Sequence, residues 1–297
     1  MRKRPRICEV VQVEWSSEFV PRAKRGDHYE DRDILRDGSA GLGVSLGLVA
    51  CGQAGSTSVT SGGADSSATS VARAESSSVA QATDGSQLTA AEQEAFYMTE
   101  ITDDIFARIK GKSFKDDCIL PREDLRYLHV LHKDIDGTVH EGEMIVNRHI
   151  AQDVLDILWE LYENDYPIEK MRLIDEYDAD DERSMEDNNS SCFNFRFISH
   201  TQRISNHGLG LAVDINTLYN PYTKVVDGER IIEPITGEPY LDRDASFDYK
   251  IEPGDLCYRL FKEHGFEWGG EWPDRKDYQH FAITDDMIAE WYPENVE

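Results

Sequence analysis

Two segments that lie far apart in the chain hold residues whose types could do chemistry together. Residues 205–216 contain His207 and Asp214, and a later segment contains Asp277 and His280. Imidazole nitrogens and carboxylate oxygens are common metal ligands. A histidine and an aspartate that converge therefore suit a metal site, provided that the surrounding elements bring the side chains together.

A short strand that begins at Gly210 would position Asp214. Side chains alternate between the two faces of a strand, so every second residue should face the core. The other face starts with small residues, which let a ligand come close to the backbone, and it ends in polar ones. Gly208 precedes the strand and allows a bend that turns the His207 ring towards Asp214. The predicted core set is Leu211, Val213 and Ile215.

Asp277 and His280 are three residues apart, so both can address one point in a helical turn or tight bend but not in a straight strand. A third segment, residues 193–197, alternates Phe with Asn194 and Arg196. It is predicted to be a strand whose three phenylalanines face the core. Because arginine is rarely buried without an anionic partner, Arg196 is a further candidate for the site.

Taken in this order, the three segments resemble the zinc D-alanyl-D-alanine carboxypeptidases of the VanY type. These belong to a wider group that includes the vancomycin-resistance dipeptidases, L-alanyl-D-glutamate endolysins and the hedgehog fold. The resemblance covers roughly residues 120–285, and its two-part signature is specific. The signature is S-x-H-x-x-G-x-A-x-D, followed by an acidic residue, two spacers, His and Phe. It is matched at Ser205, His207, Gly210, Ala212, Asp214, Asp277, His280 and Phe281.

The resemblance implies that His207, Asp214 and His280 bind Zn²⁺ and leave a fourth position open, as in catalytic zinc sites. It implies that Asp277 is the general base that takes a proton from water. Arg196 is expected to help stabilise the oxyanion that forms at the substrate carbonyl, although a structural ion pair with an acidic neighbour is the alternative.

Some positions depart from the family pattern or have no assigned role. Phe195 stands where many relatives have tyrosine, and Glu271 stands where many have aspartate. The aromatic residues Trp268, Trp272 and Tyr278 are expected either to wall a substrate groove or to pack in the core.

The fold class predicted for residues 89–297 is α+β, with a hedgehog/DD-peptidase-like small antiparallel sheet flanked by helices. Leu125–Asp134 and Thr138–Val146 are predicted strands joined by an Asp-Gly turn, and Asn147 is predicted to cap the helix that follows. Other predicted elements are a capping box at Thr89, a helix through residues 97–109, a strand at Met171–Tyr177 and a helix at Gly254–His264.

The N-terminal part of the chain is predicted to lie outside the folded domain. Residues 1–51 form an atypical extension that ends in a signal-peptide-like apolar run and a lipobox-like segment. Cys51 is therefore a candidate site for a lipid anchor, the alternative being a flexible apolar stretch beside a chance cysteine. Residues 52–88 are rich in Ser, Ala and Gly and are predicted to be a flexible linker. We expect an extracytoplasmic protein, either a membrane-anchored lipoprotein or a secreted enzyme.

The net charge and the cysteine spacing argue against a nucleic-acid-binding protein and against a thiolate zinc site. A formal net charge of −27 should repel nucleic acid, so no nucleic-acid partner is expected. The five cysteines form no C-x-x-C pair, which argues against a thiolate zinc site. In an exported protein one disulfide among Cys118, Cys192 and Cys257 is an option. We expect a monomer.

The leading functional hypothesis is a zinc-dependent D-alanyl-D-alanine carboxypeptidase that acts on peptidoglycan stem peptides. One alternative is an endopeptidase that cuts the L-alanyl-D-glutamate bond or another stem bond. The other is a non-catalytic, zinc-containing binding module. Asp277 favours an enzyme, because a binding module needs no general base.

Overall fold

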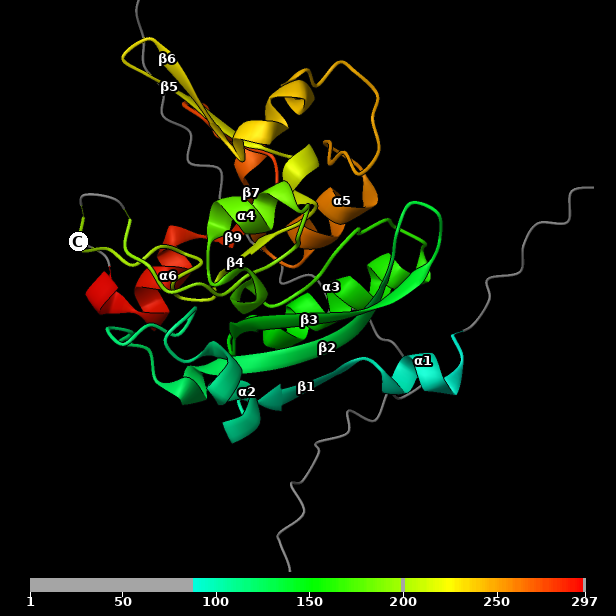
Figure 1. Ribbon diagram of the computed structural model, residues 1–297, viewed down its shortest axis with the longest axis vertical. Helices are drawn as coiled ribbons and strands as arrows, with labels where there is room; N and C mark the ends of the chain where they lie inside the picture. Colours follow the sequence, from blue (N-terminus) through cyan, green and yellow to red (C-terminus); the bar gives the residue numbers. More distant parts are fainter. Residues whose placement is uncertain (1–87, 199–200, 296–297) are drawn as a thin grey trace, which may run out of the picture. The chain divides into compact units, whose positions relative to one another are not determined.

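The computed structural model describes residues 88–198 and 201–295 (Figure 1). The predicted extension, most of the linker and the candidate anchor at Cys51 therefore lie outside the described residues. Within these two ranges, no helix combines the length and the apolar character needed to cross a bilayer. The predicted capping box is present at Thr89, whose hydroxyl accepts a hydrogen bond from the Glu92 backbone while the Glu92 carboxylate accepts one from Thr89.

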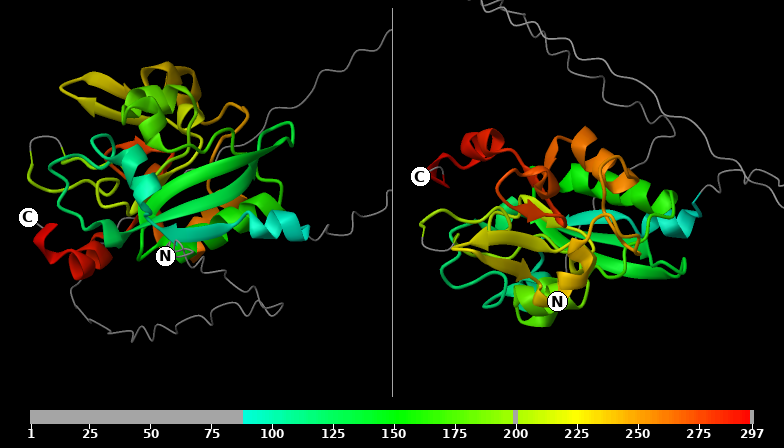
Figure 2. Two further views of the ribbon diagram at one scale, coloured as in Figure 1. Left: turned by 60° about the horizontal axis from the view of Figure 1, so that its bottom comes forward. Right: turned by 90° about the horizontal axis from the view of Figure 1, so that it is seen from above.

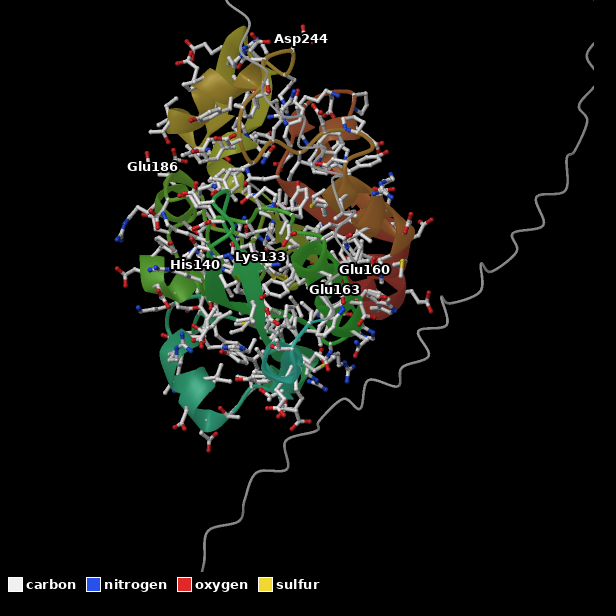
Figure 3. The ribbon with its side chains drawn as sticks, turned by 90° about the vertical axis from the view of Figure 1, so that its right-hand side faces the viewer. Lys133, His140, Glu160, Glu163, Glu186 and Asp244 are labelled. Atoms are coloured by element: carbon white, nitrogen blue, oxygen red, sulfur yellow. The ribbon has the colours of Figure 1, made fainter. Side chains whose placement is uncertain are left out.

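The first sheet is antiparallel, with strand order β1-β2-β3. Its predicted hairpin is confirmed: Lys133 pairs with Val139 across the turn, and Gly137 adopts a positive φ of 78°. Helix α3 packs its apolar stripe against this sheet (Figure 1). Lys133 and His140 of the hairpin and Glu160 and Glu163 of α3 are labelled in Figure 3. The bounds are β1 Tyr97–Glu100, β2 Leu125–Lys133, β3 Val139–Asn147 and α3 Ala151–Glu163.

Two further three-stranded antiparallel sheets follow, with strand orders β4-β9-β7 and β6-β5-β8. The β5–β6 hairpin projects away from the first sheet (yellow in Figures 1 and 2). The chain passes from the third sheet to the second between β8 and β9. The bounds are β4 Ala212–Asp214, β5 Tyr222–Val226, β6 Glu229–Glu233, β7 Phe266–Trp268, β8 Lys276–Asp277 and β9 His280–Ile283.

The remaining elements are short helices, so the α+β prediction is confirmed. The α-helices are α1 Ala90–Glu94, α2 Asp103–Ile109, α4 Asp181–Glu186, α5 Leu256–Glu263 and α6 Asp285–Trp291. The 3-10 helices are η1 Arg122–Asp124, η2 Ile174–Tyr177, η3 Thr217–Tyr219, η4 Ile235–Leu241, η5 Gly269–Glu271 and η6 Pro293–Asn295. The helix predicted at Gly254–His264 is α5, which begins after Asp255 caps it.

Three predicted elements are wrong. Residues 97–109 do not form one helix, because β1 pairs with β2 and Thr102 then caps α2 as a new start. Asn147 does not cap α3. Its side-chain amide instead donates to the Leu209 carbonyl and the Tyr292 hydroxyl. The strand predicted at Met171–Tyr177 is an irregular segment that ends in η2.

Candidate metal centre and catalytic cleft

The pairing of β4 with β9 brings the two predicted site segments together. In this antiparallel pair, Asp214 lies directly opposite His280. Asp214 Oδ1 is 3.1 Å from His280 Nδ1. Directly opposed residues of an antiparallel pair have neighbouring side chains on one face. The register of two short strands therefore positions a carboxylate against an imidazole that is 66 residues away in the chain.

A tight turn positions His207 beside this pair. The Gly208 backbone N–H donates to Ser205 Oγ at 2.9 Å. Gly208 also packs on Arg196, since a Cβ added to it would lie 2.6 Å from the Arg196 carbonyl oxygen. The two outer residues of the Ser-x-His-Gly stretch thus set the turn that holds His207.

The hydrogen bonds of His207 fix which ring nitrogen faces the cluster. Its Nδ1 is 2.8 Å from the Cys192 carbonyl oxygen, which can only accept, so Nδ1 carries the proton. The other ring nitrogen, Nε2, faces the cluster and lies 3.2 Å from Asp214 Oδ2 and 3.1 Å from His280 Nδ1. A metal-binding histidine commonly donates its other N–H to a backbone carbonyl in this way.

His207, Asp214 and His280 form a donor set that fits a metal ion. One ligand atom from each residue lies within 4.8 Å of the other two. Burial opposes ionisation of Asp214, but the charges and hydrogen bonds of His207 and His280 outweigh it and hold the pKa of this carboxyl below its usual range. The carboxylate is therefore charged at neutral pH. Two imidazoles and one carboxylate match a catalytic rather than a closed structural zinc site.

Asp277 and His280 do not lie in one straight strand, which was the condition for both to address one point. Asp277 ends β8 and His280 begins β9. Gly269 supports Asp277 closely: a Cβ added to Gly269 would lie 2.6 Å from the Asp277 carbonyl oxygen and 2.7 Å from its Cβ. Gly269, in the Trp-Gly-Gly stretch, therefore packs directly against Asp277.

The Asp277 carboxyl is buried, and its pKa is raised above the usual range of an aspartate. Its Oδ1 is buried and has no hydrogen-bond partner among the described residues. Burial raises the pKa of this carboxyl to about 7, the Asp214 charge adds to the rise, and His280 opposes it. A carboxyl with a pKa near neutrality can both accept and release a proton in one reaction cycle.

Arg196 reaches the same region, but not from a strand. Residues 193–197 are irregular, and Phe197 is 38% exposed while Phe193 and Phe195 are buried, so the predicted strand with three core phenylalanines is wrong. Arg196 Nη1 lies 3.3 Å from Asp181 Oδ2. The ion pair that the sequence left open as an alternative is therefore present, and it lies beside the candidate metal centre.

These side chains line one cleft of about 240 Å³. Asp181, the first residue of α4, borders this cleft. A larger groove of about 370 Å³, beside Trp291 and Tyr292, contains none of the predicted site residues. The cleft is lined by Ile174, Asp181, Ser184, Met185, Ser191, Arg196, His207, Asp214, Tyr222, Glu233, Asp277, Gln279 and His280.

Several cleft residues were not predicted from the sequence. Gln279 is one of the two spacers between Asp277 and His280, and its type alone carries no signal for a site. Asn194 was placed opposite the core phenylalanines. It is buried, and its amide donates to Asp181 Oδ1 at 2.8 Å. Only the three-dimensional arrangement reveals that Gln279 lines the cleft and that Asn194 supports Asp181, which also lines it.

Other sequence expectations receive structural explanations. Glu271 accepts hydrogen bonds from Tyr258 and Lys262, which ties η5 to α5, and it does not line the cleft. Trp268 is buried and donates to the Tyr278 carbonyl oxygen, which identifies it as a packing residue. The Trp272 ring lies 5.3 Å from the His280 ring.

Two further expectations are corrected. Gly210 does not leave room for a ligand: a Cβ there would lie 2.9 Å from the Asn147 backbone nitrogen, so the glycine serves close packing of β4 on the first sheet. Cys118, Cys192 and Cys257 are free thiols in the structure, and no disulfide joins them.

One comparison with known proteins gives a match, and it covers part of this region. Residues 199–283 match a family model described as D-alanyl-D-alanine carboxypeptidase. The matched region contains His207, Asp214, Asp277 and His280, whereas Arg196 lies just before it. No curated protein and no solved structure gives a match. The match supports a peptidase that acts on peptidoglycan-type substrates, and over residues 199–283 it supports the resemblance to the VanY-type D-alanyl-D-alanine carboxypeptidases.

Proposed function

We propose that the protein is a zinc-dependent D,D-carboxypeptidase that removes the terminal D-alanine of peptidoglycan stem peptides. One observation carries the proposal: Asp277, whose buried Oδ1 has no hydrogen-bond partner among the described residues, lines the same cleft as His207, Asp214 and His280, whose ligand atoms converge. A structural metal site has no use for such a carboxyl, whereas a hydrolase needs a proton acceptor at this place.

His207 Nε2, Asp214 and His280 Nδ1 would hold the zinc ion. When bound, Zn²⁺ polarises a carbonyl and lowers the pKa of water in its open position. Hydrolysis then requires a proton acceptor as water adds to the scissile carbonyl carbon. Asp277 would accept that proton and afterwards deliver it to the amine nitrogen that leaves, so it returns to its starting state.

Arg196 would stabilise the negative charge that develops on the carbonyl oxygen. Its guanidinium lines the cleft and is anchored on one side by Asp181. A fixed cation in a partly desolvated cleft stabilises an oxyanion more strongly than water does. This role is a proposal about substrate-bound geometry, and it rests on the position of Arg196 at the cleft wall.

One observation favours the endopeptidase alternative. Arg196 is the only lysine or arginine among the described residues that line the cleft, and it is already paired with Asp181. Asp181 and Glu233 add negative charge to the same lining. A substrate with a free terminal carboxylate would meet more anions than cations there, whereas an internal stem bond would not bring that carboxylate into the cleft.

We further propose that the enzyme works outside the cytoplasm as a monomer, either secreted or tethered through a lipid at Cys51. The lipobox-like sequence and the Ser-rich linker support this location. The exposed carboxylates of Glu163, Glu186 and Asp244, labelled in Figure 3, illustrate the acidic surface that makes nucleic acid an unsuitable partner.

The test is to incubate the full chain with zinc and a synthetic stem pentapeptide, with and without a chelator, and to identify the products by mass spectrometry. Loss of one terminal alanine that stops with chelator supports the carboxypeptidase. Cleavage between alanine and glutamate moves the protein to the endopeptidase alternative. Zinc binding without any product from either the peptide or intact wall favours the non-catalytic binding module.

A further inference from the structure

Gln279 has a side chain that the proposed mechanism does not use. It is 2% exposed, it lines the cleft beside Asp277 and His280, and its Oε1 is buried without a hydrogen-bond partner among the described residues. Buried side-chain amides are nearly always hydrogen-bonded, because an unpaired buried acceptor loses its hydration without compensation. An unpaired amide at this place therefore needs a physical reason.

The surrounding backbone keeps Gln279 where it is. The Gln279 carbonyl oxygen accepts a hydrogen bond from the Ile215 backbone N–H at 3.1 Å, next to β4. The preceding Tyr278 carbonyl accepts one from the Trp268 indole at 2.9 Å. Since the peptide groups on both sides of Gln279 are held, the side chain cannot leave the cleft by a simple shift of the loop between β8 and β9.

The chemistry of the amide indicates what would satisfy it. A carboxamide offers an acceptor oxygen and two donor hydrogens in one plane. A peptide backbone offers the complementary N–H and C=O groups. A carboxylate or an ammonium group would match only half of the amide. An extended peptide that enters the cleft would therefore pair with Gln279 through a backbone amide group.

We propose that Gln279 is a substrate-binding residue whose side-chain amide forms hydrogen bonds with a backbone amide of the stem peptide next to the scissile bond. This inference rests on the proposed peptidase function. It assigns Gln279 to positioning of the peptide, not to proton transfer. Its amide is unpaired in the free enzyme because its partner arrives with the substrate.

The proposal predicts opposite effects on stability and on substrate use. Gln279→Leu keeps the approximate volume and removes the unpaired amide. The free protein should become more stable, with Tm raised by about 2–4 °C. KM for the stem pentapeptide should rise by on the order of 10-fold, with kcat reduced much less. Gln279→Asn, which keeps a shorter amide, should recover part of the KM.

Thr99 offers a matched control. Its Oγ1 is also buried and lacks a hydrogen-bond partner within the described part of the chain, but Thr99 belongs to β1 and does not line the cleft. Thr99→Val should raise Tm in the same way and leave KM unchanged. This comparison separates the effect of removing a buried unpaired group from an effect on the substrate.

Calorimetric titration of the pentapeptide into zinc-loaded protein and its Gln279→Leu variant gives a readout that does not depend on turnover. Weaker binding by the variant, together with the higher Tm, supports the proposal. Unchanged KM and unchanged binding in a protein that does cleave the peptide would overturn it while leaving the proposed function intact. A lower Tm would also overturn it, because it would mean that the amide already has a partner. If the unmodified protein cleaves no stem peptide, the proposed function fails, and the substrate assigned to Gln279 fails with it.

Discussion

Asp214 of β4 lies directly opposite His280 of β9, with Asp214 Oδ1 3.1 Å from His280 Nδ1. This one cross-strand pair joins the two halves of the sequence signature. The turn that holds His207 then adds the third donor on the same side. The candidate metal centre therefore depends on the register of a strand of only three residues.

The first prediction concerns the proposed proton acceptor. Asp277→Asn keeps the shape of the side chain but cannot accept a proton. We expect hydrolysis to fall by about 10²–10⁴-fold, as is typical for loss of a general base. Because no described residue forms a hydrogen bond with the buried Asp277 Oδ1, the fold and the zinc content should be retained.

Three measurements check this: steady-state hydrolysis, metal content of the purified variant and its melting temperature. Asp244→Asn, a change at an exposed position, is the matched control and should behave like the unmodified protein. Full activity of Asp277→Asn with normal zinc content would show that another group moves the proton.

The second prediction concerns the glycine beneath Asp277. Gly269→Ala would place a Cβ 2.6 Å from the Asp277 carbonyl oxygen, so backbone must move. Overpacking of this kind costs about 1–3 kcal/mol of stability. The shift should also displace Asp277 from the cleft, so kcat should fall in the molecules that remain folded.

Chemical denaturation gives the change in stability, and activity per folded molecule gives the change in kcat. The account is wrong about this contact if Gly269→Ala preserves both. A loss of stability without any loss of kcat would mean that the position of Asp277 tolerates the shift.

The third prediction concerns the coupling of Arg196 to Asp181. The pair is partly exposed, with a distance of 3.3 Å, so its contribution to stability should be small. Its contribution to catalysis should be larger. Arg196→Ala should reduce kcat/KM by about 10²-fold, in line with removal of an oxyanion donor. Asp181→Asn should reduce it less, because the arginine remains but loses its anchor.

A variant that combines Arg196→Ala with Asp181→Asn shows whether the two residues act together or independently in catalysis. If Asp181 acts through Arg196, the double variant should be no worse than Arg196→Ala alone, which is a non-additive result. Multiplicative losses in the double variant would instead mean that Asp181 contacts the substrate by itself.

The fourth prediction concerns His132, which lies on β2 away from the cleft. Burial lowers the pKa of His132 to about 4, although its hydrogen bond to the Ile168 carbonyl opposes the shift. The charges of His140 and Arg172 add to the lowering, while Asp134 opposes it. In the unfolded chain the pKa of a histidine is about 6.5.

Between these two pKa values the unfolded chain binds a proton that the folded protein does not. The contribution of His132 to the free energy of unfolding should therefore be complete above about pH 6.5. It should fall as the pH drops towards 4, by up to about 3 kcal/mol. His132→Phe removes the titrating group. The difference in unfolding free energy between pH 6.5 and 4.5 should be smaller in this variant than in the unmodified protein. Equal pH dependence in both proteins would contradict the assignment.

The sequence predicted the convergence of the donor residues better than it predicted the helices and strands that position them. The residue types and spacing around His207, Asp214 and His280 indicated converging donors, and the structure brings these atoms together. The hairpin of β2 and β3 was also predictable, because alternating apolar residues and an Asp-Gly turn are local signals.

The remaining features depend on contacts that no local pattern encodes. Tyr97 and Ile101 begin a series of apolar residues at helical spacing, yet residues 97–100 form a strand because β2 offers an open edge. Arg196 reaches the cleft from an irregular segment held by Gly208, Asp181 and Asn194. Gln279 has no sequence signal of its own, and its role emerges only from its burial and its missing partner.

The most direct test of the account is the zinc content of the purified full chain, measured beside hydrolysis of a stem pentapeptide. The account predicts one zinc ion per chain, loss of that ion and of hydrolysis in Asp214→Ala, and recovery of hydrolysis when zinc is returned to chelator-treated unmodified protein. Hydrolysis that persists in metal-free protein, or in Asp214→Ala without bound zinc, would contradict the account.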